Sequence, residues 1–155
     1  MRAALAALFV MLALGPALAA AEPSTPAVEP RRQPVPGPSA DTEYDRGVRA
    51  RVARDWTTAE ASFRRAIALR PGFADAWNEL GFALRNQGRY PDSLAAYDEA
   101  LKLRPNFPEA LEYLGEAYVK MGRVEDARRV LDRLRPLDPA RASELDEVIG
   151  SGATR

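Results

Sequence analysis

The chain of 155 residues contains no cysteine and no histidine. The lack of cysteine excludes disulfide bonds and thiolate metal sites. The lack of histidine removes the commonest general base, the commonest metal ligand and the side chain that titrates near neutral pH. Charge of either sign is not in excess, because 22 basic residues face 22 acidic ones. No bulk charge therefore attracts nucleic acid or an anionic membrane. The sequence also lacks cysteine and histidine, on which many classes of enzyme depend.

Residues 1–21 have the layout of a secretory signal peptide. Arg2 supplies a positive charge and residues 3–14 form a short apolar run. Small side chains follow and permit cleavage after Ala19 or Ala21. The run is short for a membrane span of about 20 residues, so we expect an exported, periplasmic or secreted protein. An uncleaved anchor, which would place the protein at a membrane, remains the alternative.

A linker rich in proline separates this segment from the rest of the chain. Six prolines lie within residues 22–39, and the segment shows no apolar periodicity. Such a composition is typical of an extended, solvated spacer with polyproline II character. A docking motif for a proline-recognising partner is the alternative.

From Ala40 onward the sequence repeats every 34 residues. A fixed period of 20 to 50 residues indicates a stacked-repeat architecture. A glycine position, a proline position and two apolar positions keep the same register over three copies. The recurring residues are Gly47, Gly81 and Gly115; Pro71, Pro105 and Pro139; Phe63, Tyr97 and Leu131; and Ala66, Ala100 and Leu134.

Each copy divides into two helical patterns. In the second copy, Trp77, Leu80 and Leu84 follow the spacing of one helix face. Gly88 is placed to end that helix, and Pro91 stands where the first turn of a new helix tolerates proline. The unit is therefore a helix, a tight turn and a second helix, and the copies span residues 40–73, 74–107 and 108–139.

This pattern resembles the tetratricopeptide repeat (TPR) family, whose motif is Trp-x2-Leu-Gly-x2-Tyr followed by Ala, an aromatic residue, Ala and Pro. The resemblance implies an all-α, right-handed superhelical stack of three TPR units over residues 40–150, in an exported bacterial protein. Residues 140–150 are expected to form a C-terminal capping helix, and residues 151–155 a frayed tail. The second copy matches the motif at Trp77, Leu80, Gly81, Tyr97, Ala100 and Pro105.

The first copy departs from the motif at two positions. Glu43 and Arg46 stand where tryptophan and leucine are expected. Because a terminal repeat has no neighbour on one side, it needs a polar outer surface. We expect Glu43 and Arg46 to supply that surface. In the capping helix, Leu145 takes the tryptophan position of a fourth copy.

In TPR proteins the first helix of each repeat lines a concave groove that takes a peptide. Tyr44 and Phe82 are aromatic at groove positions where the core does not require an aromatic residue. Asn78 occupies a position where many peptide-binding TPRs have an amide that contacts the ligand backbone. By register, the candidate partner-binding residues are Tyr44, Val48, Arg51, Asn78, Phe82, Arg85, Glu112 and Glu116.

The charge of this groove is uneven. Some TPR adaptors capture the C-terminal carboxylate of a chaperone with a clamp of lysine, asparagine and arginine, and this sequence lacks that clamp. Glu109, Glu112 and Glu116 instead form one acidic stripe, which suits a basic or N-terminal segment. Arg51 and Arg85 are expected to accept acidic groups.

We therefore expect a non-enzymatic module that binds a protein or peptide partner, as an adaptor or assembly factor of an envelope complex. The sequence contains no glycine-rich phosphate loop, nucleophile–base pair or metal-binding pattern, so no cofactor and no nucleic acid are expected. Three alternatives remain open: a groove that is an ordinary solvated face, a structural or self-associating subunit that uses its convex face, and a membrane-anchored TPR subunit.

Overall fold

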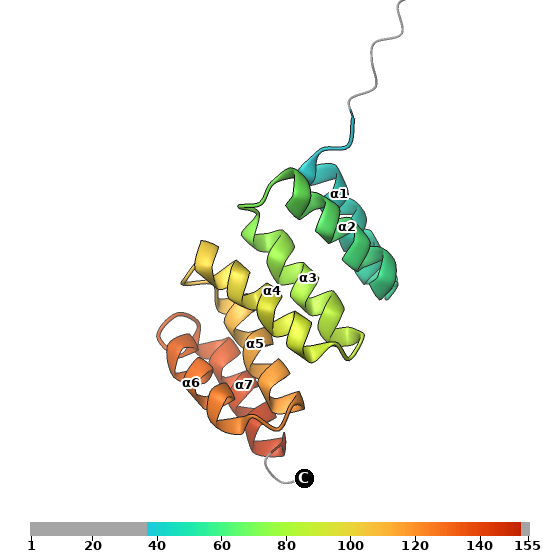
Figure 1. Cartoon of the computed structure of the whole chain (residues 1–155). Helices are drawn as coiled ribbons and strands as arrows, with labels where there is room; N and C mark the ends of the chain where they lie inside the picture. The colour runs from blue at the N-terminus through green and yellow to red at the C-terminus, as the bar shows by residue number, and fades with distance from the viewer. Residues whose placement is uncertain (1–36, 153–155) are drawn as a thin grey trace, which may run out of the picture. The chain divides into compact units, whose positions relative to one another are not determined.

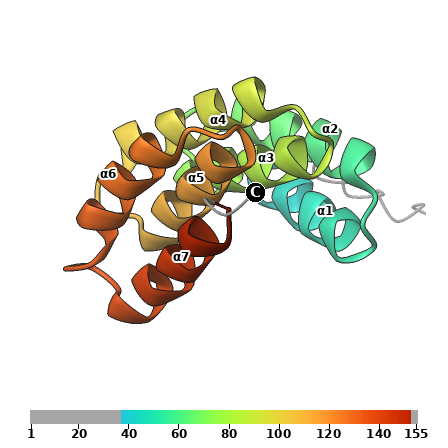
Figure 2. The same cartoon turned by 90° about the horizontal axis from the view of Figure 1, so that it is seen from below.

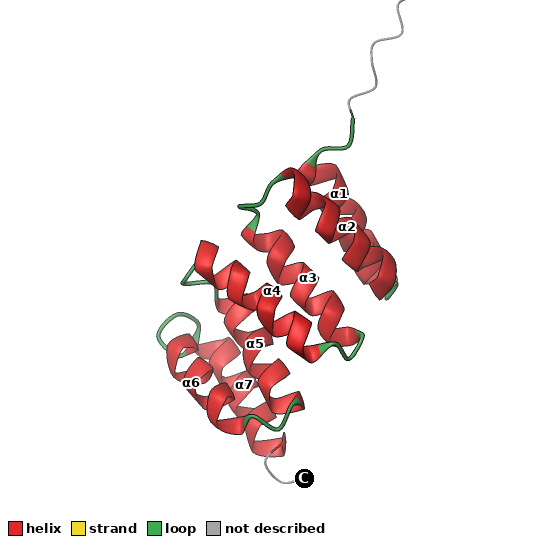
Figure 3. Ribbon diagram, viewed as in Figure 1, coloured by secondary structure: helices red, strands yellow, loops and turns green. Residues whose placement is uncertain are grey.

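The computed structural model describes residues 37–152, and regular structure within that range is entirely helical (Figures 1 and 3). The expected signal peptide, most of the expected linker and the last three residues lie outside the described residues. No helix in the described range has the length and apolar character needed to cross a membrane. The helices are α1 (Ala40–Val52), α2 (Trp56–Leu69), α3 (Ala74–Asn86), α4 (Tyr90–Leu103), α5 (Pro108–Lys120), α6 (Val124–Leu134) and α7 (Pro139–Gly152).

The helices pack in consecutive pairs. α1 packs against α2, α3 against α4 and α5 against α6, while α7 packs against both α5 and α6. Seen from below, α2, α4 and α6 form the outer layer and α1, α3, α5 and α7 form the inner layer (Figure 2). The predicted all-α superhelical stack of three helix pairs with a capping helix is thereby confirmed.

Short turns between the two helices of each pair depend on left-handed backbone. Gly88 and Gly122 have φ angles of 76° and 71°, which glycine adopts without a steric penalty. In the first repeat the equivalent residue is Arg54, with a φ of 57°. A residue with a Cβ atom adopts this region less readily, so the first turn is the least favourable of the three.

The glycine of each repeat allows a bulky side chain to approach the inner helix. A Cβ atom on Gly47 would lie 2.5 Å from the ring of Phe63, and one on Gly81 would lie 2.6 Å from the ring of Tyr97. These two contacts join helices of one unit, as expected. At Gly115 the nearest side chain is instead Leu145 of α7, 2.5 Å from such an atom. The third glycine therefore receives the capping helix.

Two buried clusters make up the core, one around the first and second repeats and one around the second and third. Trp77 packs against both clusters, and its indole Nε1 donates a hydrogen bond to the carbonyl oxygen of Pro71 at 3.0 Å. The indole thus joins the helices of its own repeat to the preceding loop. Trp77 is therefore a packing residue on the helix face that its spacing with Leu80 and Leu84 predicts.

Asp–Arg pairs tie the beginning of each of the first two repeats to its end. The guanidinium of Arg70 donates two hydrogen bonds to the carboxylate of Asp41, and that of Arg104 donates two to Asp75. In the third repeat the arginine position is occupied by Asp138. Its Oδ1 accepts hydrogen bonds from the backbone N–H groups at the start of α7, at 3.1 Å. Because of this cap, α7 begins at Pro139, one residue before the expected start.

The expectation for Glu43 is wrong. It is 8% exposed rather than part of a solvated outer surface. Its carboxylate accepts a hydrogen bond from Nε of Arg65 at 2.7 Å. Arg65 of α2 covers the acid, so an ion pair replaces the tryptophan of the motif. Arg46 is exposed as predicted.

Candidate functional site

Aromatic rings from four helices, α2 to α5, form a connected row. Phe82 of α3 lies at the centre, with its ring centroid 5.9 Å from that of Trp56 and 5.0 Å from that of Tyr113. The Tyr113 ring lies 6.3 Å from the Tyr97 ring. The predicted groove aromatic is therefore part of a row that runs from the first repeat to the third.

Two arginines cover this row. The guanidinium carbon of Arg51 lies 5.6 Å from the centroid of Phe82, and that of Arg85 lies 5.1 Å from both Phe82 and Tyr113. Contacts of this kind are worth about 0.5–2 kcal/mol each. Arg51 also forms an ion pair with Glu79, and Arg85 forms one with Glu116. The structure thus brings together four of the predicted residues, namely Arg51, Phe82, Arg85 and Glu116.

Glu79, the partner of Arg51, is a buried carboxyl group. It is 7% exposed, and its Oε2 lies 3.1 Å from Nε of Arg51. Burial raises the pKa of Glu79 to about 7, and the nearby charges of Glu109 and Asp75 add to the rise, whereas Arg51 opposes it. Negative charge is therefore concentrated around this carboxyl group.

Tyr44 and Val48 of α1 are less available than a groove position suggests. The ring of Tyr44 lies 5.7 Å from that of Phe63 and 4.9 Å from that of Phe73. Burial raises the pKa of the Tyr44 hydroxyl to about 12. Val48 is half-buried and packs against the core. Both residues hold the first repeat against the second, and each keeps only part of its surface for a partner.

Two predicted residues do not present a free side chain. Asn78 is 1% exposed, so its amide lies inside the stack rather than in an open groove. Glu112 is 6% exposed and forms an ion pair with Arg141 of α7. Burial raises the pKa of Glu112, and Arg141 opposes the rise. The expectation that these side chains face solvent in the groove is therefore wrong, because neighbouring helices cover both.

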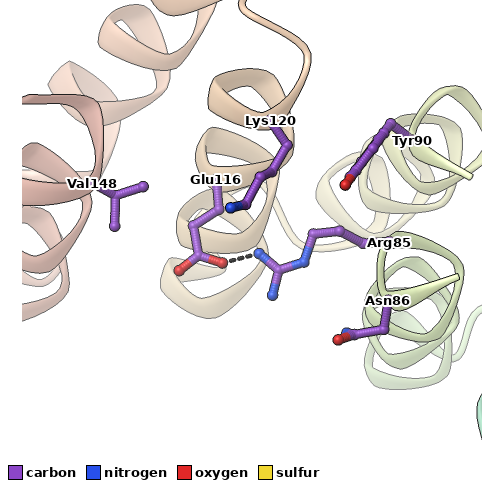
Figure 4. A pocket seen from close by; sticks show the side chains of 6 residues that line it. All are labelled: Arg85, Asn86, Tyr90, Glu116, Lys120 and Val148. Carbon is purple, nitrogen blue, oxygen red and sulfur yellow. Dashed lines mark ion pairs between the residues drawn. The ribbon is translucent and has the colours of Figure 1, made fainter. Parts of the chain in front are cut away.

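A pocket of about 410 Å³ opens beside the aromatic row (Figure 4). Arg85 of α3 and Glu116 of α5 point toward one another across it, and Val148 of α7 lies on the opposite side from Tyr90. Lys120, the last residue of α5, forms no hydrogen bond or ion pair with any described residue. The lining residues are Arg85, Asn86, Tyr90, Glu116, Lys120 and Val148.

Sequence reasoning missed part of this surface. Tyr90 lines the pocket, although the repeat register does not assign it to the groove. Tyr113 was not considered, because it lies one position beside the stripe that register assigns to the groove. The sequence clue to Tyr113 is its position four residues after Glu109. In the structure the Tyr113 hydroxyl donates a hydrogen bond to the carboxylate of Glu109 at 3.2 Å. Within residues 37–152 no group of three or more acidic side chains is placed to hold a metal ion.

Comparisons with known proteins agree with this architecture. Two family models described as tetratricopeptide repeat match the sequence, one over residues 44–106 and the other over residues 84–148. A comparison with curated proteins gave no match.

Several solved structures share the fold. The TPR2B-domain:pHsp70 complex of yeast Sti1 is similar with a TM-score of 0.70 and 22% identity, over 74% of this chain and 96% of that chain. The Arabidopsis OM64 TPR domain is similar with a TM-score of 0.69 and 16% identity, over 72% of this chain and 94% of that chain. The first TPR of Spaghetti (RPAP3) bound to the HSP90 peptide SRMEEVD is similar with a TM-score of 0.67 and 15% identity, over 74% of this chain and 95% of that chain. Repeat register, helix pairing and matched models agree, and the chain belongs to the tetratricopeptide repeat family.

Proposed function

We propose that this protein is a non-enzymatic adaptor or assembly factor whose inner helices bind a segment of a partner protein. The observation that carries this proposal is the row of rings centred on Phe82, with Arg51 and Arg85 over it and a pocket of about 410 Å³ beside it. A few residues dominate the binding energy of protein interfaces, and tryptophan, tyrosine and arginine are enriched among them. The volume lies within the range of about 300–1,000 Å³ that is typical of ligand-binding clefts.

The groove is already ordered without a partner. Arg51 is held by Glu79, and Arg85 by Glu116. Side chains that are fixed before binding lose less conformational entropy when a partner arrives. The internal ion pairs therefore favour binding by a preformed surface.

Two of the similar structures are named for complexes with Hsp70 or HSP90 peptides. This chain lacks the clamp of lysine, asparagine and arginine with which some TPR adaptors capture a chaperone's C-terminal carboxylate, and the inner helix of its third repeat carries the acidic residues Glu109 and Glu116. A segment other than an acidic chaperone tail is therefore the proposed occupant.

Export places the proposed partner in the cell envelope or outside the cell. The proposal rests on the positive charge, apolar run and small residues of residues 1–21. Within the envelope, a stack of this kind would hold a partner during the assembly of a larger complex.

Self-association through the outer layer is a second candidate. Leu69, Leu103 and Leu137 occupy the same position of successive repeats and are 52%, 45% and 37% exposed. A periodic row of exposed leucines suits a second copy of the same stack. Light scattering of the mature protein over a range of concentrations tests this candidate, because a monomer mass at every concentration would exclude it.

Affinity capture from a native envelope extract tests the proposed groove. We expect Phe82→Ala and Lys120→Glu each to reduce the captured partner at least about tenfold, since they remove the central ring and reverse the free charge of the pocket. The chain has two lysines, and Lys102→Glu on the outer helix α4 is the matched control. Thermal unfolding followed by circular dichroism checks that each variant is folded. Capture at the wild-type level by both groove variants would contradict the proposal.

A further inference from the structure

Glu109 is the acidic residue at the start of the third repeat. This repeat lacks the arginine that pairs with the equivalent acidic residue in the first two repeats. The equivalent residues Asp41 and Asp75 are each held by the arginine near the end of the same repeat. In the third repeat Asp138 takes the arginine position and caps α7 instead. Within the described residues Glu109 forms no ion pair, and its carboxylate accepts a hydrogen bond only from the Tyr113 hydroxyl.

The charge of Glu109 acts on groups from three inner helices. Burial raises the pKa of Tyr44 on α1, of Glu79 on α3 and of Tyr113 on α5, and the charge of Glu109 adds to each rise. Glu109 therefore lies close enough to the inner helices to act on each of them, and its hydrogen bond from the Tyr113 hydroxyl places its carboxylate beside that ring. Glu109 is half-buried, so a group of a partner can reach it from the groove.

Four buried side-chain atoms of the described residues lack a hydrogen-bond partner, namely Arg51 Nε, Asn78 Oδ1, Glu79 Oε2 and the Tyr97 hydroxyl. Asn78 Oδ1 and the Tyr97 hydroxyl are both without a partner, in residues that are 1% and 0% exposed. Burial raises the pKa of Tyr97, and the charges of Arg85, Glu79 and Glu109 also act on its hydroxyl. Both oxygens can accept hydrogen bonds that no described residue donates.

The surrounding arginines are already engaged. Arg51 pairs with Glu79, Arg104 with Asp75, and Arg141 with Glu112. One negative charge is left over, together with hydrogen-bond acceptors and the partly buried ring of Tyr113 beside it. A lysine or arginine side chain supplies what this set lacks, because it brings positive charge, several donors and an affinity for aromatic faces. An acidic segment would be repelled by Glu109 and would find these arginines already paired.

We infer that the groove selects partner segments that carry a lysine or arginine, whose side chain binds Glu109 alongside Tyr113. This inference rests on the proposed function and names the chemistry of its partner. The inferred contact lies on the inner helices near the start of α5, whereas the pocket of Figure 4 lies at the end of that helix.

Selection from a random twelve-residue peptide library displayed on phage tests both the inference and the function on which it rests. The immobilised full chain is expected to enrich peptides that contain lysine or arginine, and Glu109→Gln to lose that preference. Glu125→Gln, which removes an exposed carboxylate from the outer helix α6, is the matched control and should keep it. Enrichment of acidic or uncharged peptides, or a basic preference that survives Glu109→Gln, would overturn the inference alone. Failure to enrich any peptide relative to Phe82→Ala would overturn the proposed function as well.

A double-mutant cycle with one selected peptide locates the contact. By fluorescence anisotropy we expect Glu109→Gln to weaken binding about tenfold, as for the loss of one charge-assisted hydrogen bond. Replacing the basic residue of the peptide by glutamine should weaken binding by the same factor. Both changes together should weaken it no further, because they remove the same interaction. Two factors that multiply would show that the basic residue binds elsewhere and would overturn the inference.

Discussion

At the scale of single residues, a missing side chain sets the distance between the helices of a repeat. A Cβ atom on Gly81 would lie 2.6 Å from the ring of Tyr97, which is fully buried and has no room to move. We expect Gly81→Ala to lower the free energy of unfolding in urea by about 1–3 kcal/mol, as overpacking does. Gly150→Ala in α7 is the control, because nothing lies within 4 Å of its added atom. There alanine should stabilise the helix by up to about 1 kcal/mol, and equal losses at both sites would refute the explanation.

A second residue, Glu79, makes the stability of the fold depend on pH. Burial raises its pKa to about 7 in the folded protein, against an ordinary value of 4.5. Since the folded state holds this proton more tightly, the free energy of unfolding should fall as pH rises from about 4.5 to about 7 and then level off. The total change is at most about 3 kcal/mol.

Urea unfolding of Glu79→Gln across this pH range measures the contribution of that carboxyl group. The variant should lose this part of the pH dependence. Its free energy of unfolding should therefore increase relative to that of the wild type as pH rises. Glu125→Gln on the exposed face of α6 should keep the wild-type profile. Parallel profiles for wild type and Glu79→Gln would show that the buried carboxyl group is not the cause.

At the scale of elements, α7 closes the open side of the third repeat. Leu145 is fully buried against Gly115, so Leu145→Ala should lower the free energy of unfolding by about 2–5 kcal/mol. Hydrogen exchange should rise in α5 and α6 before α1 and α2, because each repeat contacts only its neighbours. Leu137→Ala, at a leucine that is 37% exposed, should change stability by no more than about 0.5 kcal/mol. A uniform rise in exchange over all helices would contradict the local role.

The elements themselves were predictable from the period, because their signals are local. Glycine, proline and apolar spacing fixed the helices and the pairing within each unit, and Phe82 and Arg85 emerged on the inner face as expected. Side-chain exposure was less predictable, because it depends on neighbours from other repeats. Asn78 is covered by packing that no local pattern reveals. Glu112 meets Arg141 across 29 residues, a spacing that the Asp41–Arg70 and Asp75–Arg104 pairs share.

At the scale of the whole described domain, ion pairs leave two charges of the groove free, one of each sign. Glu109 stands near the start of α5, and Lys120 is its last residue. They are eleven positions apart, which corresponds to a rise of about 16 Å, and about three full turns place both on nearly the same face. A bound segment with a basic group at one end and an acidic group at the other would therefore have a preferred direction along α5.

At the same scale, we expect the whole molecule to be exported and its N-terminal segment to be removed. A short apolar run followed by small residues should be recognised and cut, so the native protein should begin at Ala20 or Glu22 when its N-terminus is sequenced. Replacing both Ala19 and Ala21 by glutamine should block cleavage, because the processing site requires small side chains. The uncut protein should then sediment with membranes. Ala27→Gln in the linker is the matched control and should be processed normally, whereas a native N-terminus at Met1 would favour the anchored alternative.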